Sequence, residues 1–521
     1  MIFSVAWGAT HSTAQAEVTA FKQAIAETAA RDGDVAAFYR DSGYASLWTG
    51  ASNTERKRRA ALLDAMRTAS MHGLPADRYD ADALMAKMRN AKTDRARGIL
   101  DVEMSKIFLR LSRDMQTGIL KPAEIDKAMV RKVPYRDRAS YLVNFARSTP
   151  KAFFKALPPQ TNEYVALQKA KLSLETQIAR GGWGAKVNAK AVKPGQSGKA
   201  VVALRDRLYR MGYLKRSNIN TYDAAMDKAV RAFQEDHGMT VDGTAGASTL
   251  KEINKSAATR LQSVLVAMER ERWLNRDRGE RHVLVNIPDF SAKIMDGGKI
   301  AFQTRSVVGA GDPDRYTPEF SDVMEFMVIN PSWYVPRSIA TKEYLPQLRA
   351  NPNAVSHLEI TDSRGRVVNR ATADFASYTA KTFPFAMRQP PSSRNALGLV
   401  KFMFPNRHNI YLHDTPAKNL FGREVRAYSH GCIRLADPFD FAYALLSEQT
   451  SDPKGYFQSV LATKTETRVD LKDPLPVHII YRTAVATPKG DMQYRRDIYG
   501  RDAKVWKALQ NAGVALPNVQ G

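Results

Sequence analysis

The amino-acid sequence predicts a multidomain α+β protein in which a helical N-terminal half precedes a mostly-β domain. Three observations support this prediction: the length of 521 residues, the helical spacing of apolar residues up to about residue 254, and a change to alternating apolar and polar residues from residue 281. One hydrophobic core rarely serves a chain of this length, so about three domains are expected.

The first sixteen residues begin with a short apolar run and end in an Ala-x-Ala pattern at 14–16. This ending is typical of the cleavage site of a secretory signal peptide. The segment lacks the basic start and the full apolar stretch of a complete signal peptide. Residues 1–16 are therefore interpreted as a possible signal-peptide remnant, with a frayed terminus as the alternative.

Residues 17–180 are expected to form an α-helical domain. Apolar residues recur there at spacings of three and four, as at Leu62, Met66 and Phe108. The stretch holds no cluster of potential catalytic residues, because its histidine, His72, stands alone before a Gly-Leu-Pro turn. This part of the chain is predicted to be structural.

A smaller helical unit is expected at 193–255, after a linker at 181–197 that is rich in Gly, Ala and Lys. Apolar spacings predict three short helices in this unit. Gly212, Gly238 and an Asp-Gly turn at 242–243 would end or separate them.

Residues 281–446 are predicted to form the mostly-β domain. The run HVLVNIPDFSAKIMDGGKIAFQTRSVVG alternates apolar and polar residues around a hairpin turn at 296–298. Further strand-like runs follow at 325–335 and 398–415. The remaining residues, 447–521, are expected to pack on one of the two larger domains.

Composition narrows the classes of partner. The net charge is +25, and the basic residues are scattered rather than gathered on one segment. Such a field attracts any polyanion, but no aromatic residues are interleaved with the basic ones in a nucleic-acid-binding pattern, so no nucleic-acid partner is expected. The longest apolar runs are far shorter than the roughly 20 residues that cross a bilayer, so no transmembrane segment is predicted.

The single cysteine, Cys432, lies in the segment IYLHDTPAKNLFGREVRAYSHGCIRLADP at 410–438. A lone cysteine forms no intramolecular disulfide, and a thiol with a pKa of about 8.5 needs a nearby base or positive charge to attack at neutral pH. His413, His430 and Arg434 are available in the same segment. The pattern favours a nucleophilic cysteine over an inert buried thiol.

His430 lies two residues before Cys432, so the two side chains would share a face of an extended strand. His430 is therefore the predicted general base. Gly431 leaves room for a substrate carbonyl, and the N–H groups of Gly431 and Cys432 are predicted oxyanion donors. A helix predicted to start at Asp437 and Pro438 would bring its positive end near the thiol.

This segment resembles the signature of the L,D-transpeptidase catalytic domain, in which a histidine precedes a Ser/Thr-His-Gly-Cys cluster. The resemblance implies that His413 lines the substrate pocket, Ser429 orients His430 or its neighbours, and Cys432 is acylated. Arg434 closes the motif where some members have asparagine. Two further pocket-lining candidates are Tyr411 and Asn395.

The resemblance extends along the chain to the large murein L,D-transpeptidases, through SRDMQTGILKPAEID at 112–126, AVRAFQEDHGMTVDGTAGASTL at 229–250 and NPSWYVPRSIA at 330–340. It implies an α-helical scaffold domain, a three-helix peptidoglycan-binding module and a mostly-β sandwich catalytic domain. A capping insertion would occupy residues 338–388.

The family resemblance also implies a reaction. Cys432 would attack a tetrapeptide donor stem of peptidoglycan, expel its terminal D-Ala, and pass the acyl group to a second stem as a 3→3 cross-link. The expected partners are peptidoglycan stem peptides and glycan, with carbapenems as inhibitors, and the expected location is the periplasm or cell envelope. No metal or organic cofactor is expected, because the histidines lack ligand spacing and no Gly-rich phosphate loop occurs.

Three alternatives remain open. An L,D-carboxypeptidase would use water as the acceptor, and an enzyme that attaches envelope proteins to peptidoglycan would use a protein lysine. A peptidoglycan-binding scaffold without catalysis would need neither the thiol nor the histidines.

Overall fold

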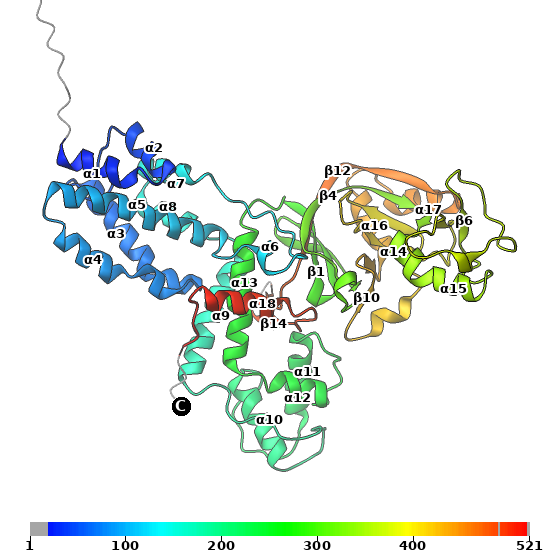
Figure 1. Ribbon diagram of the computed structural model, residues 1–521. Helices are drawn as coiled ribbons and strands as arrows, with labels where there is room; N and C mark the ends of the chain where they lie inside the picture. Colours follow the sequence, from blue (N-terminus) through cyan, green and yellow to red (C-terminus); the bar gives the residue numbers. More distant parts are fainter. Residues whose placement is uncertain (1–18, 488–489, 518–521) are drawn as a thin grey trace, which may run out of the picture.

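The computed structural model describes residues 19–487 and 490–517. The possible signal-peptide remnant at 1–16 lies outside the described residues. Figure 1 confirms the predicted α+β class: helices occupy the N-terminal half, and a large sheet occupies the region from residue 281 onward.

The N-terminal helices pack around the long helix α5 (Asp94–Thr117). Their shared core contains Trp48, Phe108 and Phe145, which are almost completely buried. The other α-helices of this region are α1 (Ala20–Ala29), α2 (Gly33–Asp41), α3 (Asn53–Arg67), α4 (Ala81–Asn90), α6 (Pro122–Ile125), α7 (Arg138–Arg147), α8 (Pro150–Ala156) and α9 (Asn162–Ala179).

The small unit contains the three predicted helices, α10 (Lys199–Arg210), α11 (Ala224–Asp236) and α12 (Ala247–Ile253). They enclose a separate core that includes Leu204, Leu208 and Phe233. The glycines that were expected to end α10 and α11, Gly212 and Gly238, have positive φ, as a left-handed helix end requires.

Helix α13 (Ala257–Trp273), to which the sequence pattern assigns no element, lies at the centre of the molecule (Figure 1). It contacts α5, α9 and α18 (Arg501–Asn511). Its buried residues include four consecutive charged ones at 269–272, so the helix has no polar face that periodicity could reveal. Each buried charge is paired, for example Arg272 with Glu269 at 2.6 Å.

Glu319, just before the first central strand, joins this helix to the C-terminal helix. Its carboxylate accepts from Arg270 of α13 at 2.7 Å and from Arg501 of α18 at 3.2 Å. All three side chains are almost fully buried. Removing the carboxylate would therefore leave Arg501 without this counter-charge and Arg270 with only its second partner, Asp502 at 3.2 Å.

We expect Glu319→Ala to lower the free energy of unfolding by about 3–5 kcal/mol, because breaking one side of a buried ion pair exposes the other to the full desolvation cost. Urea denaturation measures the change. The exposed Glu325→Ala in the following strand serves as a matched control and should shift stability by less than about 0.5 kcal/mol. Equal stability of the two variants would contradict the pairing.

The large sheet has the strand order β10-β3-β11-β9-β8-β4-β12-β1-β2. The long strand β3 pairs with β2 through its first half and with β11 and β10 through its second, which closes the sheet on itself. The bounds are β1 (Arg281–Asn286), β2 (Ser291–Asp296), β3 (Lys299–Gly309), β4 (Phe320–Ile329), β8 (Val400–Met403), β9 (Leu412–His413), β10 (Ala427–Ser429), β11 (Ile433–Leu435) and β12 (Thr467–Ile480). The predicted hairpin turn at 296–298 joins β2 to β3.

The sheet does not end at residue 446, where the sequence placed its boundary. Strand β12 lies between β4 and β1, so the C-terminal segment supplies a central strand instead of only packing against a finished domain. Helices α16 (Pro438–Leu446) and α17 (Pro453–Ala462) precede it. The hairpin β13 (Ala484–Ala486) and β14 (Met492–Tyr494) follows and leads to α18.

The insertion between β4 and β8 has its own small core and its own sheet, in the order β5 (Trp333–Tyr334), β7 (Ala386–Gln389), β6 (Glu359–Thr361). Its helical part comprises α14 (Arg337–Ile339), the π-helical turn η5 (Ala340–Tyr344) and α15 (Leu345–Ala350). We call residues 333–389 the cap. It covers the expected insertion at 338–388.

Within residues 19–487 and 490–517, no helix combines the length and the apolar character needed to cross a membrane.

Candidate active site

Four of the predicted site residues lie on one face of the sheet. Strands β9 and β11 run parallel, with Leu412 opposite Ile433 and His413 opposite Arg434. Leu412 and Ile433 point into the hydrophobic core. Because side chains alternate between the two faces, His413 and Arg434 lie on the other face. Tyr411 and Cys432, which stand two residues before them, lie on that same face.

The pairing of the two strands also holds Tyr411 and Cys432 close to each other. The N–H of Ile433 donates to the carbonyl of Tyr411 at 3.0 Å. The side chains of Tyr411, His413, Cys432 and Arg434 therefore form a compact group, which we call the thiol face. Tyr411 also packs against the core of the cap, so the cap lies beside this group.

The Cys432 thiol is partly exposed and contacts the carbonyl of Asn409 at 3.5 Å. Burial of the sulfur raises the pKa of Cys432 to about 11, although a hydrogen bond from Tyr411 and the charge of Arg434 act in the opposite direction. At neutral pH the sulfur is therefore a thiol in this structure. A nearby base has to remove its proton before attack.

This raised pKa leads to a testable pH dependence. Because the thiolate forms only near pH 11, we expect the rate of Cys432 alkylation by iodoacetamide to rise about tenfold per pH unit from pH 7 to 10. Intact-mass spectrometry measures the rate, and Tyr411→Phe, which removes the donor to the sulfur, should alkylate more slowly. A rate that levels off near pH 8 would contradict the assignment.

Residues 430–432 form a bend, not the extended strand that the sequence analysis assumed. Gly431 has φ +115°, and a Cβ there would lie 3.1 Å from Ile410 Cδ1, so the bend requires glycine. Ser429 Oγ donates to the carbonyl of Cys432 at 2.5 Å and accepts from the N–H of Gly431 at 3.1 Å. Ser429 therefore holds the bend, and its contacts are to the backbone.

The two predicted oxyanion donors differ in availability. The N–H of Gly431 already donates to Ser429, and its carbonyl accepts from Thr317 at 2.7 Å. Among the described residues, no acceptor is found for the N–H of Cys432. The assignment of Gly431 as a donor stays a prediction that would require Ser429 to release it.

His430 points toward the cap. Its Nε2 hydrogen-bonds Glu343 of η5 at 2.6 Å, and Arg315 donates to the same carboxylate at 2.9 Å. The reason is the bend, which turns His430 away from the alternation that would have aligned it with Cys432. Glu343 and Arg315 were not identified from the sequence, because both are distant from the Ser-His-Gly-Cys cluster along the chain.

His413 is buried, and its Nδ1–H donates to the carbonyl of Asp414. Burial, with a further contribution from the charge of Arg434, lowers the pKa of His413 to about 3. The imidazole is therefore neutral at physiological pH, and its ring has backbone hydrogen bonds to both Asp414 and Leu397. His413 is thus a neutral histidine, held in a fixed orientation on the same face as Cys432.

Arg434 carries a positive charge on this face, and within residues 19–487 and 490–517 no carboxylate forms an ion pair with it. Its Nε is buried without a partner among the described residues, and burial lowers its pKa while Cys432 acts in the opposite direction. A buried guanidinium favours an anionic or strongly polar ligand.

Asn395 does not line the pocket as the sequence analysis expected. It is fully buried, and its Nδ2 donates to the carbonyls of Gln389 and Pro390 at 3.1 and 3.0 Å. Its Oδ1 accepts from the N–H of Leu397 at 2.8 Å. With its amide committed to backbone groups, Asn395 fixes the loop at 389–398 that leads from the cap back to the sheet.

Comparisons with protein families identify the domains. Residues 280–473 match the L,D-transpeptidase catalytic domain YkuD, residues 197–253 match a "Putative peptidoglycan binding domain", and residues 33–170 match a scaffold domain. The sheet with the thiol face thus lies within residues that match an L,D-transpeptidase catalytic domain. The same chain also matches a scaffold domain and a peptidoglycan-binding domain, as the resemblance to the large murein L,D-transpeptidases predicted.

A relative from Haemophilus influenzae is named "Putative L,D-transpeptidase" and is 34% identical over 227 residues. The match covers 43% of this chain and 45% of that relative, so the chain spans less than half of the relative's length.

Two solved structures are also similar. An L,D-transpeptidase from Xylanimonas cellulosilytica is 16% identical, and the match covers 56% of this chain and 98% of that one, with a TM-score of 0.18. A fused Zn-dependent amidase/peptidase/peptidoglycan-binding-domain protein from Clostridium acetobutylicum is 13% identical, with 56% and 99% covered and a TM-score of 0.16.

Proposed function

We propose that this protein is a peptidoglycan L,D-transpeptidase that forms 3→3 cross-links through an acyl-enzyme on Cys432. The observation that carries the proposal is the thiol face, where Cys432 shares one side of the sheet with His413, a neutral histidine oriented by the Asp414 carbonyl. The family of the catalytic domain supplies the class of substrate.

In the first half-reaction, His413 Nε2 takes the proton of Cys432 as the sulfur attacks the carbonyl carbon of the third residue of a donor tetrapeptide. The N–H of Cys432 would stabilise the oxyanion. The C–N bond to the terminal D-Ala then breaks, and the proton passes from His413 to the leaving amine. The products are a thioester and free D-Ala.

In the second half-reaction, the side-chain amine of another stem attacks the thioester carbon. His413 takes a proton from this amine, the C–S bond breaks, and the proton returns to the sulfur. The amide formed is the 3→3 cross-link. Arg434 is placed to bind a carboxylate of one of the stems, because its charge lacks a protein counter-ion among the described residues.

The sequence-based choice of base, His430, remains a competing assignment. In this structure its ring is hydrogen-bonded to Glu343 of the cap, so a role in proton transfer would require the cap to release it. We infer that His430 instead links the cap to the Ser-His-Gly-Cys bend. The group that attacks the thioester also has alternatives. Water as the acceptor would give carboxypeptidase activity, and a protein lysine would give attachment of an envelope protein.

Intact-mass spectrometry after incubation with meropenem tests the acyl-enzyme. We expect one carbapenem adduct on the wild type and none on Cys432→Ala. Purified tetrapeptide muropeptides test the acceptor: dimers with a 3→3 bond support transfer, and trimmed monomers alone support hydrolysis. Without an adduct and without either product, the non-catalytic scaffold reading would replace this proposal. Action on peptidoglycan would place the protein in the periplasm or cell envelope.

A further inference from the structure

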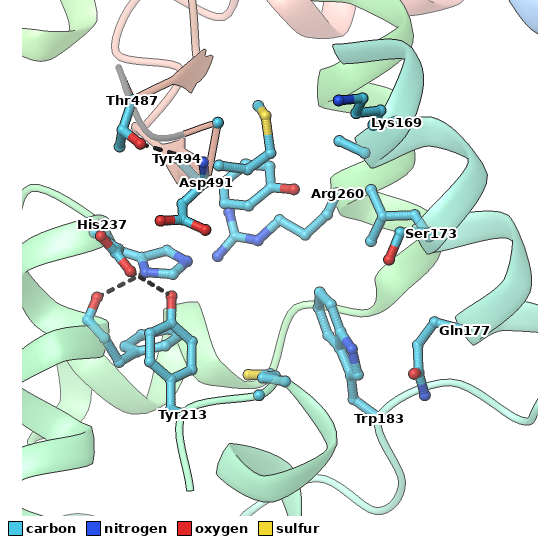
Figure 2. A pocket seen from close by; sticks show the side chains of 18 of the residues that line it. Lys169, Ser173, Gln177, Trp183, Tyr213, His237, Arg260, Thr487, Asp491 and Tyr494 are labelled. Atoms are coloured by element: carbon cyan, nitrogen blue, oxygen red, sulfur yellow. Dashed lines mark hydrogen bonds between the residues drawn. The ribbon is translucent and has the colours of Figure 1, made fainter. Parts of the chain in front are cut away.

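A cavity of about 790 Å³ lies where three parts of the chain meet (Figure 2). One wall is α9 with Trp183, another is formed by the ends of α10 and α11 in the peptidoglycan-binding module, and the third comprises Arg260 of α13 and the hairpin β13–β14. None of the thiol-face residues lines it. Its volume falls in the range of about 300–1,000 Å³ that is typical of small-molecule sites.

The wall formed by α9 presents polar groups in a row. Lys169, Ser173 and Gln177 follow one another at a spacing of four residues, so they lie on one helix face, and Figure 2 shows them along one side of the cavity. Within the described residues, the side chains of Lys169 and Ser173 have no hydrogen-bond partner. Trp183 lies at the end of this row and is partly exposed.

The opposite wall supplies an acidic and an aromatic group. Asp236 accepts from the Tyr213 hydroxyl at 3.0 Å, which fixes the carboxylate but leaves it further acceptor capacity. Tyr494 is covered by the Arg260 guanidinium, 4.6 Å from the ring centroid. The cavity thus has the partly exposed indole of Trp183 on one side and hydrogen-bonding groups in fixed positions on the other.

The charges of the cavity nearly cancel. Arg210 is paired with Asp206 at 2.9 Å and Arg260 with Glu252 at 3.0 Å. The remaining charges in the lining are the positive charge of Lys169 and the negative charges of Asp236 and Asp491. A cavity without a strong net charge favours a ligand that is polar but uncharged.

We propose that this cavity binds a pyranose unit of a glycan strand. A sugar ring has apolar C–H groups on its faces and hydroxyls at its rim, which match the partly exposed indole of Trp183 and the hydrogen-bonding groups around it. That the glycan is the peptidoglycan strand rests on the proposed function. Bound there, the strand would be held by the scaffold domain and the binding module together, while its stem peptides reach the catalytic domain.

Binding of chitotetraose, a neutral oligomer of N-acetylglucosamine, tests the proposal by isothermal titration calorimetry on the full chain. We expect binding to the wild type and at least about a tenfold weaker affinity for Trp183→Ala, because stacked rings carry much of the binding free energy at such sites. Ser173→Trp, a substitution at an exposed position that fills the cavity, should abolish binding. The neighbouring Leu172→Ala, at a side chain that does not line the cavity and is 45% exposed, is the matched control and should bind normally.

The proposal would be overturned if the wild type did not bind chitotetraose. It would also be overturned if Trp183→Ala and Ser173→Trp bound it as tightly as the wild type does. The same holds if a charged oligosaccharide such as a heparin tetrasaccharide binds at this cavity more tightly than the neutral one. Cys432→Ala should bind chitotetraose like the wild type, and Trp183→Ala should still form the carbapenem adduct. Failure of the adduct alone would therefore refute the proposed function without affecting this site.

Discussion

Replacing Cys432 by alanine is expected to lower the rate of cross-link formation at least about 10⁴-fold, because no other group on the thiol face can form the acyl-enzyme. Chromatography of muropeptide products measures the rate. Cys432→Ser should be nearly as inactive, since a hydroxyl is far harder to ionise than a thiol.

The loss should not come from unfolding. The Cys432 side chain is partly exposed, and its polar contacts are limited to Tyr411 and the Asn409 carbonyl, so the alanine variant should melt within a few degrees of the wild type. A variant that retains more than a few per cent of the activity while properly folded would show that the thiol is not the nucleophile.

His413→Gln is expected to lower the rate about 10³-fold, within the range of roughly 10²–10⁴ that general-base catalysis contributes. Glutamine keeps a hydrogen-bonding side chain at this buried position but cannot take the thiol proton. Activity of the wild type should not fall between pH 8 and pH 5 through protonation of this base, because its pKa is lowered to about 3.

The matched control for this experiment is His430→Gln, which keeps a donor to Glu343 and should lose less than about tenfold if His430 only links the cap to the bend. Glu343→Gln, which weakens the same contact from the other side, should behave similarly. The opposite ranking, with His430→Gln the more damaging variant, would restore the assignment of His430 as the base.

The sequence by itself determined the class of the fold and the identity of the chemical group. Periodicity placed the helical half and the start of the sheet at residue 281, because these signals are local along the chain. The single cysteine in its Ser-His-Gly-Cys cluster identified the candidate nucleophile for the same reason. The predicted turn at 296–298 and the three short helices of the module were also local features.

Other features were decided only by tertiary structure. The sequence pattern did not predict helix α13, because its buried charges are neutralised by partners distant in sequence, such as Glu319. Strand β12 lies in the middle of the sheet through pairings that no local signal specifies. The candidate base depends on which strands are neighbours. A spacing of two residues favoured His430, but the Gly431 bend turns it toward the cap, while the parallel pairing of β9 with β11 brings His413 onto the face of Cys432. Spacing along a chain predicts proximity only where the backbone stays regular, and here glycine breaks that regularity at the site itself.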